Sequence, residues 1–321
     1  MRIVFLGGTR FIGLRAVKLA RERGHSVAVL HRGIHNAALP DGVEEFIVDR
    51  DDSMALSSAL KRAKADVVVD SFAMTGDQTR KTIDCLKNNT NSVVILSSQD
   101  VYAQFGRLNG HPASVIEDSV SESSPLTVRF PFQGLADHEG GAKYDKKDVE
   151  SLYRLASDDL FKSVTALRLP AVFGWGDYQR RFGRIVDALD AGIRRIPCQN
   201  QASWRWTQGH VENMAHAIAL SAEKSIPGFH IFNVGEKSSP TMRERVEKIA
   251  QMLGVPIDWE ETDPVPDDFS ILGKMPNDFV VSTEKIRSVL GYEEVLAQDA
   301  CYADLIEWCR QSRSSKTPAK I

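Results

Sequence analysis

Short apolar runs alternate with amphipathic segments over roughly the first hundred residues, and this alternation constrains the fold more than any other feature. The apolar runs have the composition of buried strands and cover 2–6 (RIVFL), 26–30 (SVAVL), 44–48 (EEFIV), 66–70 (DVVVD) and 92–97 (SVVILS). Helices are predicted between them over 11–23, 53–64 and 77–88. Strands that alternate with helices in this way form a parallel sheet covered on both faces. We therefore expect an α/β protein with a doubly wound parallel sheet.

A glycine-rich turn joins the first strand to the first helix and reads Gly7-Gly8-Thr9-Arg10-Phe11-Ile12-Gly13. Gly7 permits a sharp turn without a Cβ clash, and Gly13 lets the helix approach the strand closely. The free N–H groups and the positive dipole end of the helix then face the ligand of the turn, which in this context is a diphosphate. The motif predicts a Rossmann domain that binds a dinucleotide. The predicted contacts are Gly7, Thr9, Arg10, Phe11, Ile12 and Gly13.

The end of the second strand indicates which dinucleotide binds. An acidic residue is expected about twenty residues after the turn when the ligand has a free ribose 2′-hydroxyl. The chain has His31-Arg32-Gly33 there instead. Arg32 and Arg10 suit a 2′-phosphate, because a guanidinium donates paired hydrogen bonds to phosphate oxygens. The sequence thus favours NADP over NAD; in the alternative, NAD binds and both arginines are solvated surface side chains.

The regular alternation ends near residue 104. Residues 104–141 are rich in Gly, Ser, Pro and acidic residues, and an irregular stretch of that length is usually functional or mobile. Beyond it, strands are predicted over 163–169 and 229–234, a loop over 260–281, and helices over 145–157, 181–191, 210–223, 241–253, 283–290 and 299–311. We expect a dinucleotide-binding domain at 1–173, to which about 203–235 returns, a smaller C-terminal substrate-binding domain from about 174–202 and 236–311, and a flexible tail at 312–321.

Composition excludes several classes of partner. The 321 residues suffice for two domains, and 42% hydrophobic with 26% charged residues is ordinary for a globular protein. With 43 acidic and 40 basic residues the net charge is −3, so nucleic acid and anionic lipid exert no general attraction. The four cysteines show no CxxC pair and no zinc-finger spacing, and no apolar run reaches the ~18 residues of a membrane span. We expect reduced thiols, no metal, no membrane contact and a cytoplasmic location.

Further motifs follow the glycine turn in order along the chain. They are HRG at 31–33, VDRDD at 48–52, SSQDVY at 97–102, LRLPAVFG at 167–174, HVEN at 210–213 and FNVGE at 232–236. Together with GGTRFIG they resemble the extended or atypical short-chain dehydrogenase/reductases, which include the NAD-dependent epimerases and dehydratases, over about residues 1–310. The resemblance implies a homodimer. It also implies that Asp49 and Arg50 lie beside the adenine, that Ser71, Phe72 and Ala73 line the cofactor cleft, and that Pro170 to Val172 lie near the nicotinamide.

The resemblance also implies a catalytic serine, tyrosine and lysine. Ser98 lies at the position of the catalytic Ser/Thr, four residues before Tyr102. Members that transfer hydride use Tyr-x-x-x-Lys on one helix face, where the ammonium lowers the phenol pKa and holds the nicotinamide ribose. Here the segment reads Lys143-Tyr144-Asp145-Lys146-Lys147-Asp148-Val149-Glu150. Asp148 therefore stands where the usual lysine partner of Tyr144 would be.

The assignment of the dyad stays open at this point. Lys146 and Glu150 keep the family's lysine–glutamate spacing, which places Ala142 at the family's tyrosine position. Tyr144 is then displaced into a loop before the helix, or Lys147 replaces the usual partner, or another residue such as Tyr102 donates the proton. We rank Lys146 above Lys147 as the cofactor-binding lysine. The non-catalytic interpretation is a solvated charged turn around a packing tyrosine.

Arginines beside aromatic residues are candidates for holding an anionic substrate group. Arg205 lies between two tryptophans in WRWT at 204–207, and Arg180 and Arg181 follow GWGDYQ. A guanidinium in such a place can clamp a phosphate and stack on a ring. Arg180, Arg205 and Tyr102 are therefore the predicted substrate-binding residues. The alternative is a hydrophobic tryptophan anchor with a structural ion pair.

Two classes of function fit these features. The first is an NAD(P)-dependent reductase, epimerase or dehydratase for a sugar-like or secondary-metabolite small molecule, in which Ser98 polarises the substrate oxygen, Tyr144 exchanges a proton and Lys146 positions the ribose. The second is a non-redox nucleotide- or RNA-binding protein, because GGTRFIG also resembles the chloroplast stem-loop RNA-binding proteins of the same superfamily. The displaced dyad favours the second class, and the net charge of −3 favours the first. We expect a small-molecule substrate rather than nucleic acid.

Overall fold

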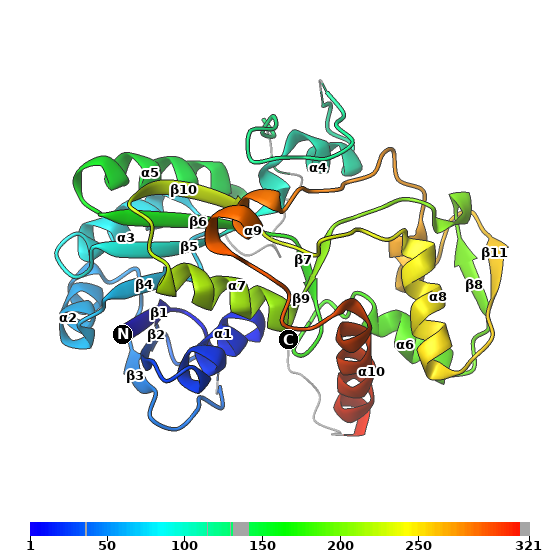
Figure 1. Ribbon diagram of the computed structural model, residues 1–321, viewed down its shortest axis with the longest axis horizontal. Coiled ribbons are helices and arrows are strands. Elements are labelled where there is room, and N and C mark those ends of the chain that lie inside the picture. The colour runs from blue at the N-terminus through cyan, green and yellow to red at the C-terminus, as the bar shows by residue number, and fades with distance from the viewer. Residues whose placement is uncertain (36, 114, 129, 131–140, 315–321) are drawn as a thin grey trace.

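A seven-stranded parallel sheet forms the centre of the fold, in the order β10-β6-β5-β4-β1-β2-β3 (Figure 1). The computed structural model describes residues 1–35, 37–113, 115–128, 130 and 141–314. The strands are β1 (Arg2–Leu6), β2 (Ser26–His31), β3 (Glu44–Ile47), β4 (Val67–Asp70), β5 (Ser92–Ser98), β6 (Ser163–Leu169) and β10 (Gly228–Asn233). All neighbouring strands pair in parallel. The order reverses between β1 and β4, which places a ligand crevice at their carboxyl ends.

Helices cover both faces of this sheet, as predicted. One face packs against α1 (Phe11–Glu22), α7 (Val211–Glu223) and α9 (Glu284–Leu290), and the other against α2 (Ser53–Ala63), α3 (Gly76–Leu86) and α5 (Lys146–Asp159). Successive residues of β1 alternate between the two layers, because Ile3 and Phe5 belong to one core cluster and Val4 and Leu6 to the other. The apolar strand runs are therefore buried on both sides, and the doubly wound sheet is confirmed.

The C-terminal part of the chain builds a third core on the right of Figure 1. Its elements are α6 (Gly183–Asp190), α8 (Met242–Leu253), α10 (Gln298–Ser314) and a parallel pair of short strands, β8 (Arg195–Cys198) and β11 (Asp258–Glu261). Thr241 and Glu244 form a capping box that starts α8, and Gly254 ends it in the left-handed conformation. A second parallel pair, β7 (Ala171–Phe173) and β9 (Gln208–His210), lies between this core and the sheet (Figure 1).

Several segments differ from the predicted elements, and the short strands β7, β8 and β9 were not predicted. The predicted loop at 260–281 contains the end of β11 and a 3-10 helix at Asp267–Leu272, because Phe269 and Leu272 are buried in the third core. The irregular stretch begins with helix α4 (Ala103–Leu108), while 131–140 lie outside the described residues. Helix α10 continues to Ser314, and the rest of the predicted flexible tail also lies outside them. Within the described residues, no helix combines the length and apolar character that a membrane span requires.

Candidate functional site

A cleft of about 420 Å³ opens at the carboxyl ends of β1, β2, β4, β5 and β6. The glycine turn forms one wall, and the residues that follow β4 and β5 form another. The predicted site residues that line it are Gly7, Thr9, Arg10, Phe11, Ile12, Gly13, Arg32, Arg50, Ser71, Phe72, Ser98, Tyr144, Lys146 and Pro170. The fold therefore brings most of the predicted cofactor residues and all three predicted catalytic residues to one place.

Helix α1 presents an uncapped N-terminus to this cleft. The side chain of Arg10, the N-cap residue, makes no capping hydrogen bond to the N–H groups of the helix. The first turn, whose residues are all described, contains no acidic residue. A Cβ on Gly13 would lie 2.8 Å from the Cα of Gly8, so only glycine allows this close approach. Across the cleft, the buried hydroxyl of Ser71 has no hydrogen-bond partner among the described residues. Uncapped N–H groups and an unpaired hydroxyl fit the diphosphate of a dinucleotide.

The predicted arginines border the same cleft. Arg32 is exposed and follows β2, where His31 is held by a 2.5 Å hydrogen bond to Glu45. The guanidinium carbon of Arg10 lies 5.1 Å from the ring centroid of Tyr178. Both guanidiniums therefore lie on the solvent side of the cleft, where a ligand anion would meet them.

Arg50 also lines the cleft, but its guanidinium bonds to the protein interior. It donates two hydrogen bonds of 3.0 Å to the Asp70 carboxylate, one of 2.7 Å to the Phe72 carbonyl and one of 2.9 Å to the Thr82 hydroxyl. Burial lowers the pKa of Arg50, but the Asp70 charge more than offsets this and the pKa is raised. These partners give Arg50 a structural role, and its predicted contact with adenine stays a prediction because Arg50 also lines the cleft.

Three other predicted cofactor residues lie outside the lining of the cleft. Asp49 is exposed, and its carboxylate accepts a hydrogen bond from the N–H of Asp51 at 3.0 Å. Ala73 and Val172 are buried in the cores behind the cleft. Ala73 contributes to the cleft indirectly, because its carbonyl accepts a hydrogen bond from Lys146 at 2.7 Å.

Ser98 and Tyr144 lie at the edge of the cleft beside a carboxyl group that sequence reasoning did not single out. Ser98 ends β5, and its Oγ accepts the N–H of Asp100 at 3.3 Å. The Tyr144 phenol donates to Oδ2 of Asp100 at 2.7 Å. Burial and this carboxylate raise the pKa of Tyr144 well above its ordinary value, and burial raises the pKa of Asp100 to about 6. The pair combines a protonated phenol with a carboxyl group that titrates near neutral pH.

Lys146 reaches the cleft from the first position of α5. Its Nζ donates to the carbonyl oxygens of Ala73 and Leu96 at 2.7 and 2.9 Å, and burial lowers its pKa to about 8. Among the described residues these are two partners for three N–H groups, which leaves one donor for a ligand hydroxyl. Lys147 points elsewhere, with a 2.5 Å hydrogen bond to the carbonyl of Thr127. The geometry therefore favours Lys146 over Lys147 as the ligand-facing lysine.

The start of α5 accounts for the unusual spacing of Tyr144 and Lys146. Asp145 is the N-cap, and its side chain accepts the N–H of Asp148 at 2.9 Å. Tyr144 therefore precedes the helix and Lys146 begins it, and extended backbone at Asp145 lets both side chains line the cleft. One turn later, Glu150 pairs with the buried Arg168 at 2.7 Å.

Tyr102, a predicted substrate contact, is fully buried behind the cleft. Its hydroxyl donates to Oδ1 of Asn233 at 2.6 Å and accepts from Arg168 at 2.9 Å. Burial raises its pKa to about 12. These contacts make Tyr102 part of an internal polar network at the ends of β5, β6 and β10, and correct the prediction that it touches substrate.

The two predicted substrate arginines also lie away from the cleft lining. Arg180 forms an ion pair with Asp187, and its guanidinium carbon lies 5.3 Å from the ring centroid of Trp308. Arg205 is exposed, with its backbone N–H bonded to Asp278 at 2.8 Å. The alternative gave a structural ion pair to Arg205, but among the described residues the ion pair belongs to Arg180, whereas Arg205 is exposed.

Tyr178 is a cleft residue that sequence reasoning missed. Its ring stands edge-on to Phe11 of the glycine turn at 6.3 Å between centroids, beneath the Arg10 guanidinium. The side chain is 58% exposed. It lies on the segment that leads into α6, so the third core reaches the glycine turn through it. No motif marks this position, whereas Asp100 had one signal, a carboxylate two residues after Ser98 at a strand end.

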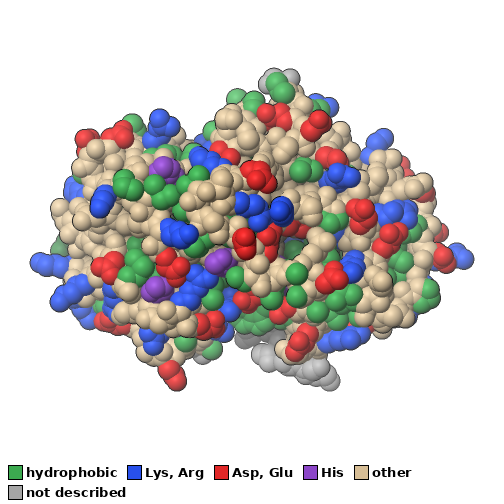
Figure 2. Space-filling model, in the orientation of Figure 1, with side chains coloured by type: hydrophobic (Ala, Val, Ile, Leu, Met, Phe, Trp, Pro, Cys, Tyr) green, Lys and Arg blue, Asp and Glu red, His purple; other side chains and the backbone are tan. Residues whose placement is uncertain are grey.

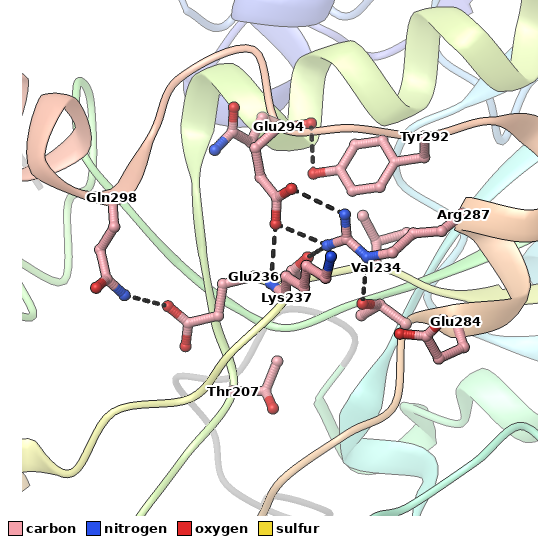
Figure 3. A network of polar contacts seen from close by, with 12 residues as sticks. Thr207, Val234, Glu236, Lys237, Glu284, Arg287, Tyr292, Glu294 and Gln298 are labelled. Atoms are coloured by element: carbon pink, nitrogen blue, oxygen red, sulfur yellow. Dashed lines mark hydrogen bonds and ion pairs between the residues drawn. The ribbon is translucent and has the colours of Figure 1, made fainter.

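A second cavity, of about 430 Å³, lies between the N-terminus of α7, the loop after β10 and the segment that joins α9 to α10. Figure 3 shows the polar network at this junction. Arg287 donates to both carboxylate oxygens of Glu294, at 2.7 and 2.8 Å, and the N–H of Lys237 donates to Glu294 at 2.8 Å. Gln298 reaches Glu236 at 3.5 Å. The network joins the C-terminal helices to the sheet, away from the predicted catalytic residues.

Comparisons with known proteins bear on the fold and the class of protein. No protein-family model matches the chain. The 2′-dehydrokanamycin reductase of Streptomyces kanamyceticus is 23% identical over 271 residues, which are 81% of this chain and 70% of the reductase. The chloroplast stem-loop binding protein of 41 kDa b of Arabidopsis thaliana is 25% identical over 312 residues, 91% of this chain and 75% of that protein. The UDP-glucose 4-epimerase of Lactobacillus helveticus is 22% identical over 326 residues, 91% and 92% of the two chains.

Solved structures share the fold over almost the whole chain. MoeE5 in complex with UDP-glucose and NAD superposes with a TM-score of 0.71 at 21% identity, and the match covers 98% of this chain and 100% of MoeE5. The Thermus thermophilus UDP-glucose 4-epimerase in complex with NAD gives a TM-score of 0.71 at 18% identity, over 97% and 99% of the two chains. These comparisons confirm the Rossmann fold and the resemblance to proteins of the extended short-chain dehydrogenase/reductase kind, among them epimerases and a reductase.

Proposed function

From the resemblance of the chain to the extended short-chain dehydrogenase/reductases, we propose that it is an NAD(P)-dependent epimerase, dehydratase or reductase acting on a sugar-like small molecule. One observation carries the proposal. The cleft that exposes the uncapped N-terminus of α1 also contains Ser98, Tyr144 and Lys146. A diphosphate site and proton-transfer groups in one cleft are what hydride transfer to or from a nicotinamide requires.

The residues of the cleft fit a dinucleotide. The N–H groups that open α1 and the Ser71 hydroxyl would hold the diphosphate, and Pro170 borders the end of the cleft near Ser98. Arg10 and Arg32 favour a 2′-phosphate, so we propose NADP as the preferred ligand, although the solved relatives named above hold NAD. When bound, the nicotinamide supplies a hydride acceptor or donor.

Three residues of the cleft would polarise the substrate, exchange a proton with it and position the cofactor ribose. Ser98, which ends β5, would donate its hydroxyl hydrogen to the reacting oxygen of the substrate. Tyr144 would exchange a proton with that oxygen. Lys146 would place its remaining N–H toward a ribose hydroxyl, because its other donors are fixed by Ala73 and Leu96.

Epimerisation and net redox chemistry are both compatible with this arrangement. Relatives named above act on UDP-glucose or on 2′-dehydrokanamycin, as their names state, and both compounds carry sugar hydroxyl or carbonyl groups. Nucleotide-sugar conversion and tailoring of a secondary metabolite are therefore the substrate classes we propose. A homodimer and a cytoplasmic location stay predictions.

The test combines ligand binding with a substrate panel. NADP and NAD are titrated by calorimetry, and UDP- and dTDP-sugars and amino sugars are followed by absorbance at 340 nm for net redox and by NMR for epimerisation. We expect conversion of one class, lost in Ser98→Ala with cofactor binding retained. Ser288→Ala on the exposed face of α9 is the matched control and keeps full activity. Dinucleotide binding without conversion of any member by either readout would contradict the enzymatic proposal.

An RNA-binding function on the same fold is the second candidate, and the chloroplast relative supports it. The face in Figure 2 carries lysine, arginine and acidic side chains interspersed rather than one basic area. The net charge of −3 also gives no general attraction to a polyanion. Gel shifts with stem-loop RNA over a range of salt decide between the candidates, since salt-sensitive binding at low ionic strength would support this one.

A further inference from the structure

A buried carboxyl group lies behind the tyrosine of the cleft. Asp100 belongs to the 3-10 turn Gln99–Val101 that follows β5, and it is 7% exposed. Its Oδ2 accepts the Tyr144 phenol at 2.7 Å, and its N–H donates to Ser98 Oγ at 3.3 Å. Its Oδ1 has no hydrogen-bond partner among the described residues. Asp100 is thus bonded to two cleft residues without lining the cleft itself.

The charged groups around Asp100 come from α5 and its cap. Lys146 is the nearby cation, but its Nζ donates to backbone carbonyls of Ala73 and Leu96. Glu150 faces the same region and is paired with Arg168. The Asp145 carboxylate caps the helix beside Tyr144. Among the described residues no ion pair joins Asp100 to a cation, and the Tyr144 phenol, at 2.7 Å, is its closest polar partner.

The group beside the Tyr144 phenol carries the opposite charge to the lysine of a tyrosine–lysine dyad. An ammonium beside the phenol would lower its pKa, whereas the carboxylate raises it. Tyr144 therefore stays protonated at neutral pH. It can accept a proton from a substrate only if its own proton leaves at the same time, and the hydrogen bond to Asp100 Oδ2 provides a route for that proton.

We propose that Asp100 is a positioning residue that acts through Tyr144, by holding the phenol toward the cleft and accepting the proton that the phenol releases. The proposal rests on the function proposed above. In the oxidative direction the substrate O–H bond breaks and its proton passes to Tyr144 Oη, while the phenol O–H bond breaks and that proton passes to Asp100 Oδ2. A carbonyl forms as the electron pair of the substrate C–H bond leaves as hydride to the oxidised nicotinamide dinucleotide. The reductive direction reverses each transfer.

The first test uses the protein without cofactor or substrate. Tyrosine labelled with ¹³C at Cζ is incorporated, and the Tyr144 resonance is assigned by its absence in Tyr144→Phe. We expect a step in its shift near pH 6 as Asp100 ionises, and no phenol ionisation in the ordinary tyrosine range near pH 10, because the phenol pKa is raised well above it. In Asp100→Asn the step disappears and the phenol titrates at a lower pH than in the wild-type protein. A Tyr144 titration unchanged by Asp100→Asn would overturn the proposal.

The second test is kinetic and uses a substrate from the panel. Asp100→Asn is expected to reduce kcat in the oxidative direction about 10²-fold or more, with the dissociation constant of the dinucleotide unchanged, because general-base transfer is worth about 10²–10⁴. Asp100→Glu restores part of the rate and shifts the acidic limb of the pH profile. Asp158→Asn on the exposed side of α5 is the control. An Asp100→Asn enzyme with a wild-type pH profile would contradict the relay.

The two tests separate this inference from the proposed function. If the wild-type protein binds no dinucleotide, the proposed function is wrong. The NMR titration still reports whether Asp100 changes the pKa of the Tyr144 phenol. If Asp100→Asn does not fold, the same titration is made with Asp100→Glu. In Asp100→Glu the longer side chain is expected to shift both the ionisation of the carboxyl group near pH 6 and the titration of the Tyr144 phenol. A shift in one without a shift in the other would overturn the coupling between the two groups.

Discussion

Arg50 and Asp70 form a buried ion pair through two hydrogen bonds of 3.0 Å, directly beneath the cleft. Tyr153 adds a third bond to the Asp70 carboxylate at 2.9 Å. Because Asp70 ends β4 and Arg50 follows β3, the pair fixes the loop after β3 against the neighbouring strand end. The hydrogen bonds of this guanidinium thus stabilise the shape of the cleft that Arg50 lines.

Removal of this guanidinium should destabilise the fold strongly. Arg50→Ala leaves the Asp70 charge buried without its cation, and the expected loss is about 3–5 kcal/mol in the free energy of unfolding. Arg80→Ala removes an arginine whose side chain is 55% exposed and should cost less than about 1 kcal/mol. Urea unfolding measures both. A small loss of unfolding free energy in Arg50→Ala, together with weaker dinucleotide binding, would instead indicate that Arg50 mainly contacts the adenine.

The cofactor preference should depend on Arg32. Arg32→Ala removes a guanidinium that has access to a 2′-phosphate at the end of β2, so NADP affinity is expected to fall about 10–100-fold with little change for NAD. Calorimetric titration of both dinucleotides gives the ratio. Arg154→Ala on exposed α5 is the control. Equal weakening for the two dinucleotides would show that Arg32 does not read the 2′-position.

Asp100 should make stability depend on pH in a defined direction. Its pKa is raised to about 6 in the folded protein, so between about pH 4 and 6 the unfolded chain ionises while the native carboxyl stays protonated. The wild-type protein should therefore lose up to about 3 kcal/mol relative to Asp100→Asn as pH rises through this window, and nothing below it. Urea unfolding at several pH values measures the difference. A difference that is constant with pH would contradict the raised pKa.

The two adjacent lysines should behave differently. Lys146→Met removes the buried ammonium that lines the cleft, and we expect about a tenfold or greater loss of dinucleotide affinity, since a hydrogen bond to a charged donor is worth about 1.5–3 kcal/mol. Lys147→Met removes a side chain that bonds to the carbonyl of Thr127, and cofactor binding should be unchanged. Fluorescence or calorimetric titration compares them. Similar losses in both variants would undermine the assignment of Lys146.

The sheet and the glycine turn were predictable because they depend on local patterns. Each strand of the sheet is a buried apolar run, and Gly13 is required by a contact within the same strand–turn–helix unit. The direction of an arginine is not local. The resemblance places Arg50 beside the cofactor. Its hydrogen-bond partners Asp70 and Thr82, however, belong to β4 and α3, and no spacing along the chain predicts these contacts.

The candidate catalytic residues were only partly predictable for the same reason. The sequence placed Ser98 and Lys146 by their motifs and left Tyr144 uncertain, because its position relative to the helix depends on where Asp145 caps α5. Asp100 was not predicted because its role depends on a contact with Tyr144, which lies 44 residues later in the chain. Tyr102 was misassigned because its burial depends on Asn233 at the end of β10.

A crystal structure of the protein grown with NADP tests the central claim most directly. The account predicts diphosphate oxygens within hydrogen-bond distance of the N–H groups that open α1, with the nicotinamide directed toward Ser98 and Tyr144. A dinucleotide bound elsewhere, or density showing the glycine turn filled by the protein's own side chains at saturating NADP, would contradict it.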